Sequence, residues 1–284
     1  MIYVFGANGQ LGLSLKKVQQ KEIKVSYLSS KDLDITSTES LTSFFNKANS
    51  GDFIINCAAY TAVDKAESEK ERAFEVNAGS LKIISALCKS HGVNLIHIST
   101  DYIFDGTTNS SLDEEAMTNP INIYGESKLS GENNIKESGC SYSIFRTSWV
   151  FSEFGSNFVK SMINLSARET LNVVSDQIGS PTYAPDLAEV LYTSVQNFEK
   201  CKNQVFNFSN TGKCSWYEFS VRIMSLIEAK TQVTPIPTTE YPTPAKRPHY
   251  SLLNKSKIKS TFNIEVPYWK DGLDDCLRRL GERK

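Results

Sequence analysis

Short apolar runs alternate with longer amphipathic stretches through the first half of the chain. Runs of strand length lie at residues 2–5, 24–28, 53–56, 95–98 and 142–146. The stretches between them carry apolar residues at helical spacing, which predicts helices at residues 10–20, 38–48 and 64–90 and another that begins near Asn122. Strands that alternate with helices in this way predict an α/β fold, with a parallel sheet covered by helices on both faces.

The second half of the chain is less regular. Strands are predicted at residues 171–174 and 205–208, and helices at residues 157–167, 186–198, 215–230 and 269–279. Five of the nine prolines fall within residues 235–248. Because proline interrupts helices, this segment is predicted to be an ordered loop without helix.

Composition and charge exclude several classes of protein. Hydrophobic residues make up 40% of the 284, enough for a sizeable packed core. The 31 basic and 32 acidic residues leave a net charge of −1 without a long run of either sign, which argues against a nucleic-acid partner. No apolar segment approaches the length of a membrane span, roughly 18 residues. The strand and glycine turn at the N-terminus leave no room for a signal peptide.

The cysteines give no sign of a disulfide framework or a metal site. None of the six forms a Cys-x-x-Cys pair, and the three histidines are scattered. Reduced thiols in a cytoplasmic protein are the simplest interpretation.

A glycine-rich turn joins the first predicted strand to the first predicted helix. Gly6, Gly9 and Gly12 lie three residues apart, and Gln10 and Leu11 complete the segment. Glycines permit a sharp turn, a close approach of phosphate to the backbone and tight packing of helix against strand. The helix N-terminus then offers free N–H groups to a diphosphate. The segment therefore predicts a dinucleotide-binding site, although a tight strand-to-helix loop would use the same residues.

The end of the second predicted strand bears on the choice of cofactor. No acidic residue stands there to bind an adenosine ribose; Ser30 and Lys31 follow instead. Small hydroxyls and a lysine suit a 2′-phosphate, which favours NADPH over NADH, but the same residues also suit an ordinary polar loop. Asp34 and Ile35 come next and are predicted to lie beside the adenine.

Three further residues suggest carbonyl reduction. Tyr124 and Lys128 are four residues apart at the start of a predicted helix and so share one face. A nearby ammonium lowers the pKa of a phenol, which makes Tyr124 a candidate general acid. Thr100 directly follows the fourth strand, where ligands bind in open parallel sheets. An exposed helix pair and a capping threonine are the structural alternatives.

Several longer segments carry a resemblance to a known family. In order they are Gly6–Gly12, Asn56–Glu67, Ser99–Gly106, Pro120–Lys128, Arg146–Phe151, Asp176–Thr182 and Arg247–Leu253. With these segments the chain resembles the extended short-chain dehydrogenase/reductase superfamily and, within it, the dTDP-4-dehydrorhamnose reductases. The fold expected from this is a Rossmann-type doubly wound parallel sheet with a smaller, interleaved C-terminal domain. Residues 1–150, with a returning segment near 183–210, would form the dinucleotide-binding domain, and residues 151–182 and 211–284 the substrate-binding domain.

The resemblance also implies roles for individual residues. Tyr124 would donate the proton, Lys128 would be its electrostatic partner and Thr100 would donate a hydrogen bond to the substrate carbonyl. The residues implied for cofactor binding are Gly6, Gly9, Gln10, Leu11, Gly12, Ser30, Lys31, Asp34, Ile35, Ala58, Ala59, Tyr60, Thr61, Tyr124 and Lys128. Those implied for the sugar nucleotide are Thr100, Asp101, Trp149 and Arg247. Trp149 would also suit the core. Arg247 would bind the diphosphate through both arms of its guanidinium; the alternative interpretation is an ordinary surface arginine.

One departure from the family concerns metal. Some relatives bind magnesium between subunits through acidic residues, one of them just after the third glycine, where this chain has Leu13 and Ser14. We therefore predict no metal site, and either a monomer or a homodimer.

The resemblance predicts NAD(P)H-dependent reduction of the C4 ketone of a nucleotide-linked 6-deoxy sugar. The expected reaction converts dTDP-4-dehydro-β-L-rhamnose to dTDP-β-L-rhamnose. A reductase of another 4-keto nucleotide sugar, or a regulatory subunit that binds cofactor without turnover, remains an alternative. A dehydratase is disfavoured, because Tyr102 occupies the position where such an enzyme carries a catalytic glutamate.

Overall fold

The computed structural model describes residues 1–282 and has a six-stranded parallel sheet at its centre. In spatial order its strands are β10 (Gln204–Asn207), β5 (Tyr142–Thr147), β4 (Asn94–Thr100), β3 (Phe53–Asn56), β1 (Ile2–Phe5) and β2 (Val25–Leu28). The chain moves from β1 to β2 on one side and then continues from β3 on the other. The predicted Rossmann-type, doubly wound sheet is confirmed, and its strand order reverses at β1 and β3.

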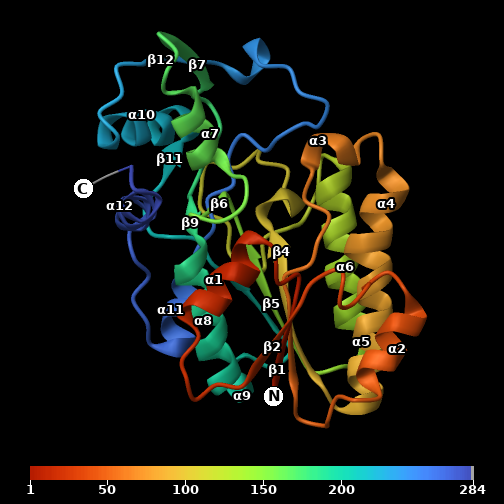
Figure 1. The fold of residues 1–284 in the computed structure, drawn as a ribbon. Helices are drawn as coiled ribbons and strands as arrows, with labels where there is room; N and C mark the ends of the chain where they lie inside the picture. Colours follow the sequence, from red (N-terminus) through yellow and green to blue (C-terminus); the bar gives the residue numbers. More distant parts are fainter. Residues whose placement is uncertain (283–284) are drawn as a thin grey trace.

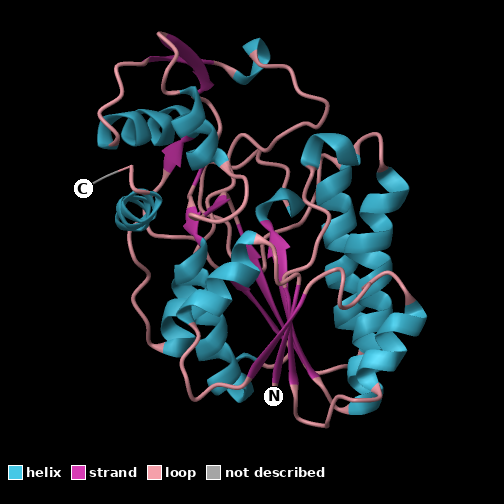
Figure 2. Cartoon of the chain, in the orientation of Figure 1, coloured by secondary structure: helices cyan, strands magenta, loops and turns pink. Residues whose placement is uncertain are grey.

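Helices cover both faces of this sheet (Figures 1 and 2). One face carries α1 (Gln10–Val18), α8 (Ala184–Gln196), α9 (Phe198–Cys201) and α11 (Ser256–Phe262). The other carries α2 (Thr38–Phe45), α5 (Ser80–His91) and α6 (Ile123–Ser138). The helices α1, α2 and α10 (Trp216–Leu226) stop earlier than the sequence predicted.

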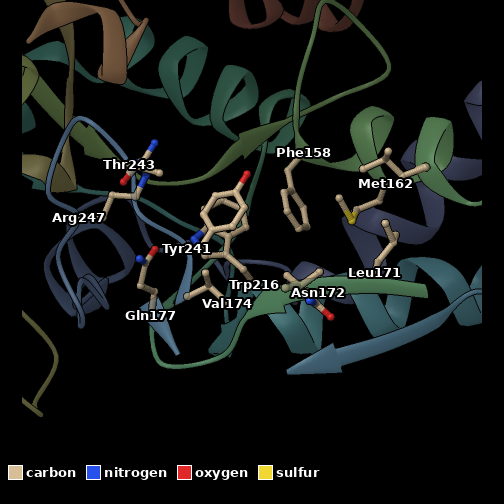
Figure 3. A pocket seen from close by; sticks show the side chains of 12 residues that line it. Phe158, Met162, Leu171, Asn172, Val174, Gln177, Trp216, Tyr241, Thr243 and Arg247 are labelled. Carbon is tan, nitrogen blue, oxygen red and sulfur yellow. The ribbon is translucent and has the colours of Figure 1, made fainter. Parts of the chain in front are cut away.

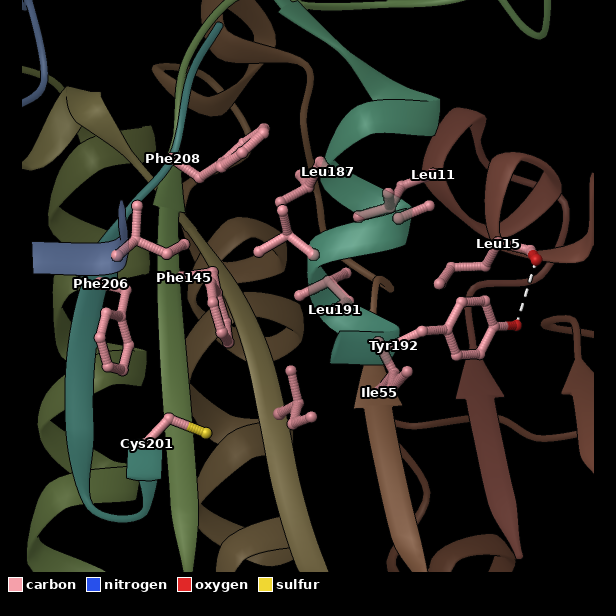
Figure 4. Close-up of a cluster of buried hydrophobic side chains, with 14 of the residues drawn as sticks. Leu11, Leu15, Ile55, Phe145, Leu187, Leu191, Tyr192, Cys201, Phe206 and Phe208 are labelled. Atoms are coloured by element: carbon pink, nitrogen blue, oxygen red, sulfur yellow. Dashed lines mark hydrogen bonds between the residues drawn. The ribbon is translucent and has the colours of Figure 1, made fainter. Parts of the chain in front are cut away.

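Two apolar clusters hold the helices on the sheet. On the α1 and α8 face, Tyr192 donates a hydrogen bond from its hydroxyl to the Leu15 carbonyl, at 3.1 Å, within a layer of buried leucines and phenylalanines (Figure 4). On the opposite face, Phe5, Phe45 and Ile84 are fully buried. A strand buried on both sides needs apolar residues at every position, which explains the continuous apolar runs in the sequence.

A smaller lobe lies beyond the carboxyl ends of the strands (Figure 1). It contains α7 (Phe158–Leu165), α10 and α12 (Trp269–Leu280) around a separate apolar cluster that includes Phe151, Phe219 and Leu273. Three strand pairs belong to it: β6 (Val150–Phe151) with β9 (Thr182–Tyr183), β7 (Thr170–Val174) with β12 (Gln232–Ile236), and β8 (Ile178–Gly179) with β11 (Cys214–Ser215). The predicted domain boundaries stay a prediction, and the last two residues of the second domain lie outside the described part of the chain.

The single long helix predicted at residues 64–90 is wrong. The chain there forms α3 (Val63–Ala66), α4 (Lys70–Phe74), a π-helix (Glu75–Gly79) and then α5. Residues 67–69, where the helix is broken, are all polar, so they have no apolar side chain to hold a continuous helix against the core. Gly92 ends α5 in the left-handed conformation, at φ 66°.

The prediction of a loop at residues 235–248 is wrong for the first residues of that segment. Pro235 and Ile236 belong to β12, and residues 238–240 form one 3₁₀ turn. Proline cannot donate a ladder hydrogen bond, but within residues 1–282 β12 pairs with β7 alone and is an edge strand, so this position tolerates it.

No helix within residues 1–282 is long and apolar enough to cross a lipid bilayer. The six cysteines are free, and five of them are buried. No group of three or more His, Cys, Asp or Glu side chains in the same range is arranged to hold a metal ion.

Candidate active site

The glycine turn lies where the strand order of the sheet reverses. Gly6 follows β1 with φ +78°, and a Cβ on it would lie 2.7 Å from the Ala58 nitrogen, just past β3. Helix α1 begins at Gln10, and its N-cap residue Gly9 has no side chain that could bind the free N–H groups of the first turn. Free N–H groups therefore face the crevice at the reversal point, which is where open α/β sheets bind the phosphates of a nucleotide.

A cavity of ≈ 380 Å³ opens at this point. Eight of the predicted cofactor residues line it: Gly6, Gly9, Ser30, Asp34, Ile35, Ala58, Ala59 and Tyr60. They come from the ends of β1, β2 and β3, which the parallel sheet brings to one edge. The cavity is therefore built from segments far apart in the sequence.

Other predicted cofactor residues do not line this cavity. The Gln10 carboxamide accepts hydrogen bonds from Ser152 and Asn157, at 3.0 and 2.9 Å, and so joins α1 to the smaller lobe. Leu11 is buried in the apolar cluster under α1, and Gly12 packs against the Gly6 carbonyl. Lys31 and Thr61 are exposed outside the lining.

An arginine that the sequence did not single out lines the same cavity. Arg72, on α4, faces the β2 end and forms an exposed ion pair with Glu75 at 2.6 Å. The two acids of the β2 loop are bound locally: Asp32 accepts from Ser29, and Asp34 from Thr36. The positively charged side chain that lines the cofactor cavity is thus Arg72, whereas Lys31 does not line it. The sequence did not identify it, because Arg72 lies in a polar helical stretch far along the chain from the end of β2.

The predicted catalytic residues are buried at the carboxyl end of β4. Thr100 ends that strand, and Tyr124 lies in the first turn of α6, which Asn122 caps by accepting from the Gly125 nitrogen at 2.8 Å. A Cβ on Gly125 would lie 2.2 Å from the Tyr102 carbonyl oxygen. Only glycine lets α6 approach the segment after β4 so closely, and this approach brings Tyr124 within hydrogen-bonding range of Thr100.

The prediction that Lys128 lowers the pKa of Tyr124 is wrong for this structure. Burial raises the pKa of Tyr124 to about 12; a hydrogen bond with Thr100 opposes the rise and the charge of Asp101 adds to it. The Lys128 ammonium instead donates to the Ile98 carbonyl at 2.7 Å and lies 3.3 Å from His97. At neutral pH the phenol therefore keeps its proton, the form that a proton donor needs.

Asp101 is a buried acid beside Thr100. Its Oδ1 accepts from the Thr100 hydroxyl at 3.2 Å and Ser251 also lies within hydrogen-bonding reach of the carboxylate, whereas no hydrogen bond of ordinary geometry reaches Oδ2. Burial raises the pKa of Asp101 to about 6. A buried carboxylate oxygen without a partner is costly, so this atom is suited to receive a hydroxyl from a ligand.

A second cavity, of ≈ 310 Å³, lies in the smaller lobe. Phe158 and Trp216 pack together in its wall, with ring centroids 4.6 Å apart, and Tyr241, Thr243 and Arg247 also line the cavity (Figure 3). Trp149 lies behind this wall: its indole stacks on Trp216 with ring centroids 3.6 Å apart. Flat aromatic faces on one side and a guanidinium on the other suit a ligand that combines a heteroaromatic ring with phosphate.

Arg247 connects this second cavity to α3, the short helix after β3. Its guanidinium donates to both carboxylate oxygens of Asp64, at 3.0 and 2.7 Å, and to Thr243. Burial raises the pKa of Tyr102, and the charge of the nearby Arg247 opposes this rise. The centroid of the Tyr102 ring lies 5.6 Å from that of Tyr124. The arginine therefore lies between the second cavity and the catalytic residues, and the sequence did not predict its partner Asp64.

Comparison with known proteins agrees with this arrangement. The family model described as the RmlD substrate binding domain matches residues 1–282. A dTDP-4-dehydrorhamnose reductase from Sinorhizobium fredii is 38% identical over 98% of this chain and 95% of its own length. The chain belongs to the dTDP-4-dehydrorhamnose reductase family. The sequence-based assignment is thereby confirmed.

Solved structures of this family share the whole fold. A dTDP-4-dehydrorhamnose reductase from Clostridium acetobutylicum superposes with a TM-score of 0.93 at 40% identity and covers 99% of both chains. One from Bacillus anthracis, solved in complex with NADP, has a TM-score of 0.92 at 37% identity and covers 98% of both chains.

Proposed function

We propose that this protein uses NADPH to reduce the C4 ketone of dTDP-4-dehydro-β-L-rhamnose, giving dTDP-β-L-rhamnose. The observation that carries the proposal is the burial of Thr100, Tyr124 and Lys128 at the carboxyl end of β4 in a chain of this family. A bound nicotinamide would supply the hydride. The protein's own groups handle the oxygen: Tyr124 gives its hydroxyl proton to the developing alkoxide, and Thr100 donates a hydrogen bond to it.

The cofactor would occupy the cavity at the glycine turn. Its diphosphate fits against the N-terminus of α1, and its adenosine end against the β2 loop. Arg72 supports NADPH over NADH, because a guanidinium binds a 2′-phosphate and the neighbouring acids are already bound to Ser29 and Thr36. The NADP in the Bacillus anthracis relative supports the same choice.

The nucleotide half of the substrate would occupy the cavity of the smaller lobe. We place its base among Trp216, Tyr241 and Phe158, and its diphosphate near Arg247. The sugar then extends toward Thr100, where the unpartnered Asp101 oxygen can accept one of its hydroxyl groups. Trp149 supports the aromatic wall from behind through its stacking on Trp216.

The location and assembly of the protein are part of the proposal. Six free cysteines, five of them buried, support a cytoplasmic protein, since reduced thiols persist there. A monomer or a homodimer stays a prediction.

A direct assay tests the function. Purified protein is mixed with dTDP-4-dehydrorhamnose and NADPH, and loss of absorbance at the reduced nicotinamide band is followed. NADH in place of NADPH, and UDP-linked 4-keto sugars in place of the dTDP sugar, test each half of the specificity. Oxidation of NADPH only in the presence of the dTDP sugar supports the proposal. Absence of oxidation by the wild-type protein, while NADP⁺ still binds, would contradict it and favour a regulatory subunit.

A further inference from the structure

A partly exposed ion pair joins Arg247 to the short helix after β3. Asp64, in the first turn of α3, accepts from Nη1 of Arg247 at 3.0 Å and from Nη2 at 2.7 Å. Its Oδ1 also accepts from the Ala245 nitrogen at 3.2 Å. The hydrogen bond from Arg247 lowers the pKa of Asp64, so both groups stay charged at neutral pH.

This contact uses only one edge of the guanidinium. An arginine can bind an anion through either of two edges, Nη1 with Nη2 or Nε with Nη2. Asp64 occupies the first edge, and Nη1 also donates to the Thr243 hydroxyl and the Ala245 carbonyl. Within residues 1–282, none of the hydrogen bonds of Arg247 uses Nε. Because Arg247 also lines the cavity of the smaller lobe, its second edge is the one left for an anion there.

The same segment is tied to the helix that carries the catalytic tyrosine. Asn122, the N-cap of α6, donates from its carboxamide nitrogen to the Lys246 carbonyl at 2.8 Å. Glu67, at the end of α3, accepts from the Ile123 nitrogen at 2.9 Å. Helix α3, the residues beside Arg247 and the first turn of α6 are therefore joined by hydrogen bonds. A guanidinium held in this set of contacts keeps a constant distance from the catalytic phenol.

We propose that Asp64 is a positioning residue for the substrate: it holds Arg247 by one edge and so presents the other edge to the diphosphate of the nucleotide sugar. The inference rests on the proposed function, which supplies the diphosphate. An arginine that is held before binding loses less side-chain freedom when the ligand arrives, so the affinity is higher. The charge of Asp64 is balanced by the guanidinium that it binds, so the carboxylate repels the diphosphate little.

Binding of dTDP tests this role without turnover, and thymidine, which has the base but no phosphate, is the control ligand. Dissociation constants are measured by calorimetry for the wild type, Asp64→Ala, Arg247→Ala and the double variant. Because 40% of the Asp64 side chain is exposed, its removal leaves no deeply buried charge unpaired, and the variants are expected to fold. Asp176→Ala is the matched control: this carboxylate anchors the other end of the same proline-rich segment, where it accepts from the Thr238 nitrogen and hydroxyl.

Asp64→Ala should weaken dTDP binding about five- to tenfold, the effect of having to order one arginine, and leave thymidine binding unchanged. It should raise the KM for the sugar nucleotide by the same factor with little change in kcat. Arg247→Ala should weaken dTDP binding about 10- to 100-fold, and adding Asp64→Ala to it should change nothing further. Asp176→Ala should bind dTDP as the wild type does.

The proposal would be overturned by a wild type that binds no dTDP, or by dTDP binding in Asp64→Ala within about twofold of wild type. It would also be overturned by an equal loss for thymidine, or by the same loss when Arg247 is already absent. A similar loss in Asp176→Ala would count against it too, because order in the whole segment would then be the cause. The expected pattern of dTDP binding, in a protein that turns over no keto sugar, would instead refute the proposed function alone.

Discussion

The replacement of Gly125 by alanine tests how closely α6 must approach the segment after β4. The new Cβ would lie 2.2 Å from the Tyr102 carbonyl oxygen and 3.0 Å from Cβ of Pro120, whereas real Cβ atoms keep at least 3.0 Å from their neighbours. The first turn of α6 must therefore move by about 0.8 Å, since a backbone oxygen has no rotamer by which to yield. Tyr124 is the preceding residue and moves with it.

Two effects follow from this displacement. Overpacking costs about 1–3 kcal/mol of folding free energy, partly offset by the gain of up to about 1 kcal/mol when alanine replaces glycine in a helix. The kcat should fall by about 10²-fold, because a shift of about 1 Å in a catalytic group has an effect of this size. The dissociation constant for NADP⁺ should change little, because the glycine turn lies on a different element.

The assay compares kcat, NADP⁺ binding and urea unfolding in Gly125→Ala and in Gly79→Ala. Gly79 is the matched control: it is exposed in the π-helix, and a Cβ there would lie 3.7 Å from its nearest neighbour, the Phe74 carbonyl. It should retain wild-type kcat. A Gly125→Ala protein with kcat within twofold of wild type would refute the reasoning, because Tyr124 would then not depend on this contact.

Three further predictions concern single side chains. Tyr124→Phe should lower kcat by about 10²–10⁴-fold at unchanged NADP⁺ affinity, and equal turnover would remove Tyr124 as proton donor. Arg72→Ala should raise the KM for NADPH several-fold more than that for NADH, with Lys31→Ala as the control; an equal rise for both cofactors would assign Arg72 to the diphosphate instead. The third concerns pH. Burial raises the pKa of Asp101 from 3.8 to about 6, so the folded protein holds this proton more tightly and loses stability as pH rises through that window. Asp101→Asn should therefore be more stable than wild type, by about 3 kcal/mol in urea unfolding at pH 7.5 and by about half of that at pH 5; a difference independent of pH would contradict this sign.

Patterns of neighbouring residues predicted the structure correctly where a helix or strand depends mainly on residues within its own segment. The strand at Ile2–Phe5 and the helix start near Asn122 were both predicted, because strand burial and helix initiation depend on neighbouring residues. The end of the first helical turn in residues 64–90 was not predicted, because a polar stretch breaks the helix there. The π-helix that follows places Asn77 against other elements. That side chain binds both the Tyr60 backbone and Ser127, which belong to other elements.

The sequence by itself determined the order of strands and helices, the glycine turn and the chemical identity of Thr100, Tyr124 and Lys128. Which side chains lie beside these three residues was decided by tertiary packing. The pKa of Tyr124 rises rather than falls because burial, which a linear pattern does not reveal, outweighs the opposing hydrogen bond with Thr100. Arg72 faces the cofactor cavity, and His97 lies against Lys128, only because the sheet aligns strand ends from distant parts of the chain. Spacing along one element reports which residues share a face, whereas contacts between elements are decided by how those faces pack.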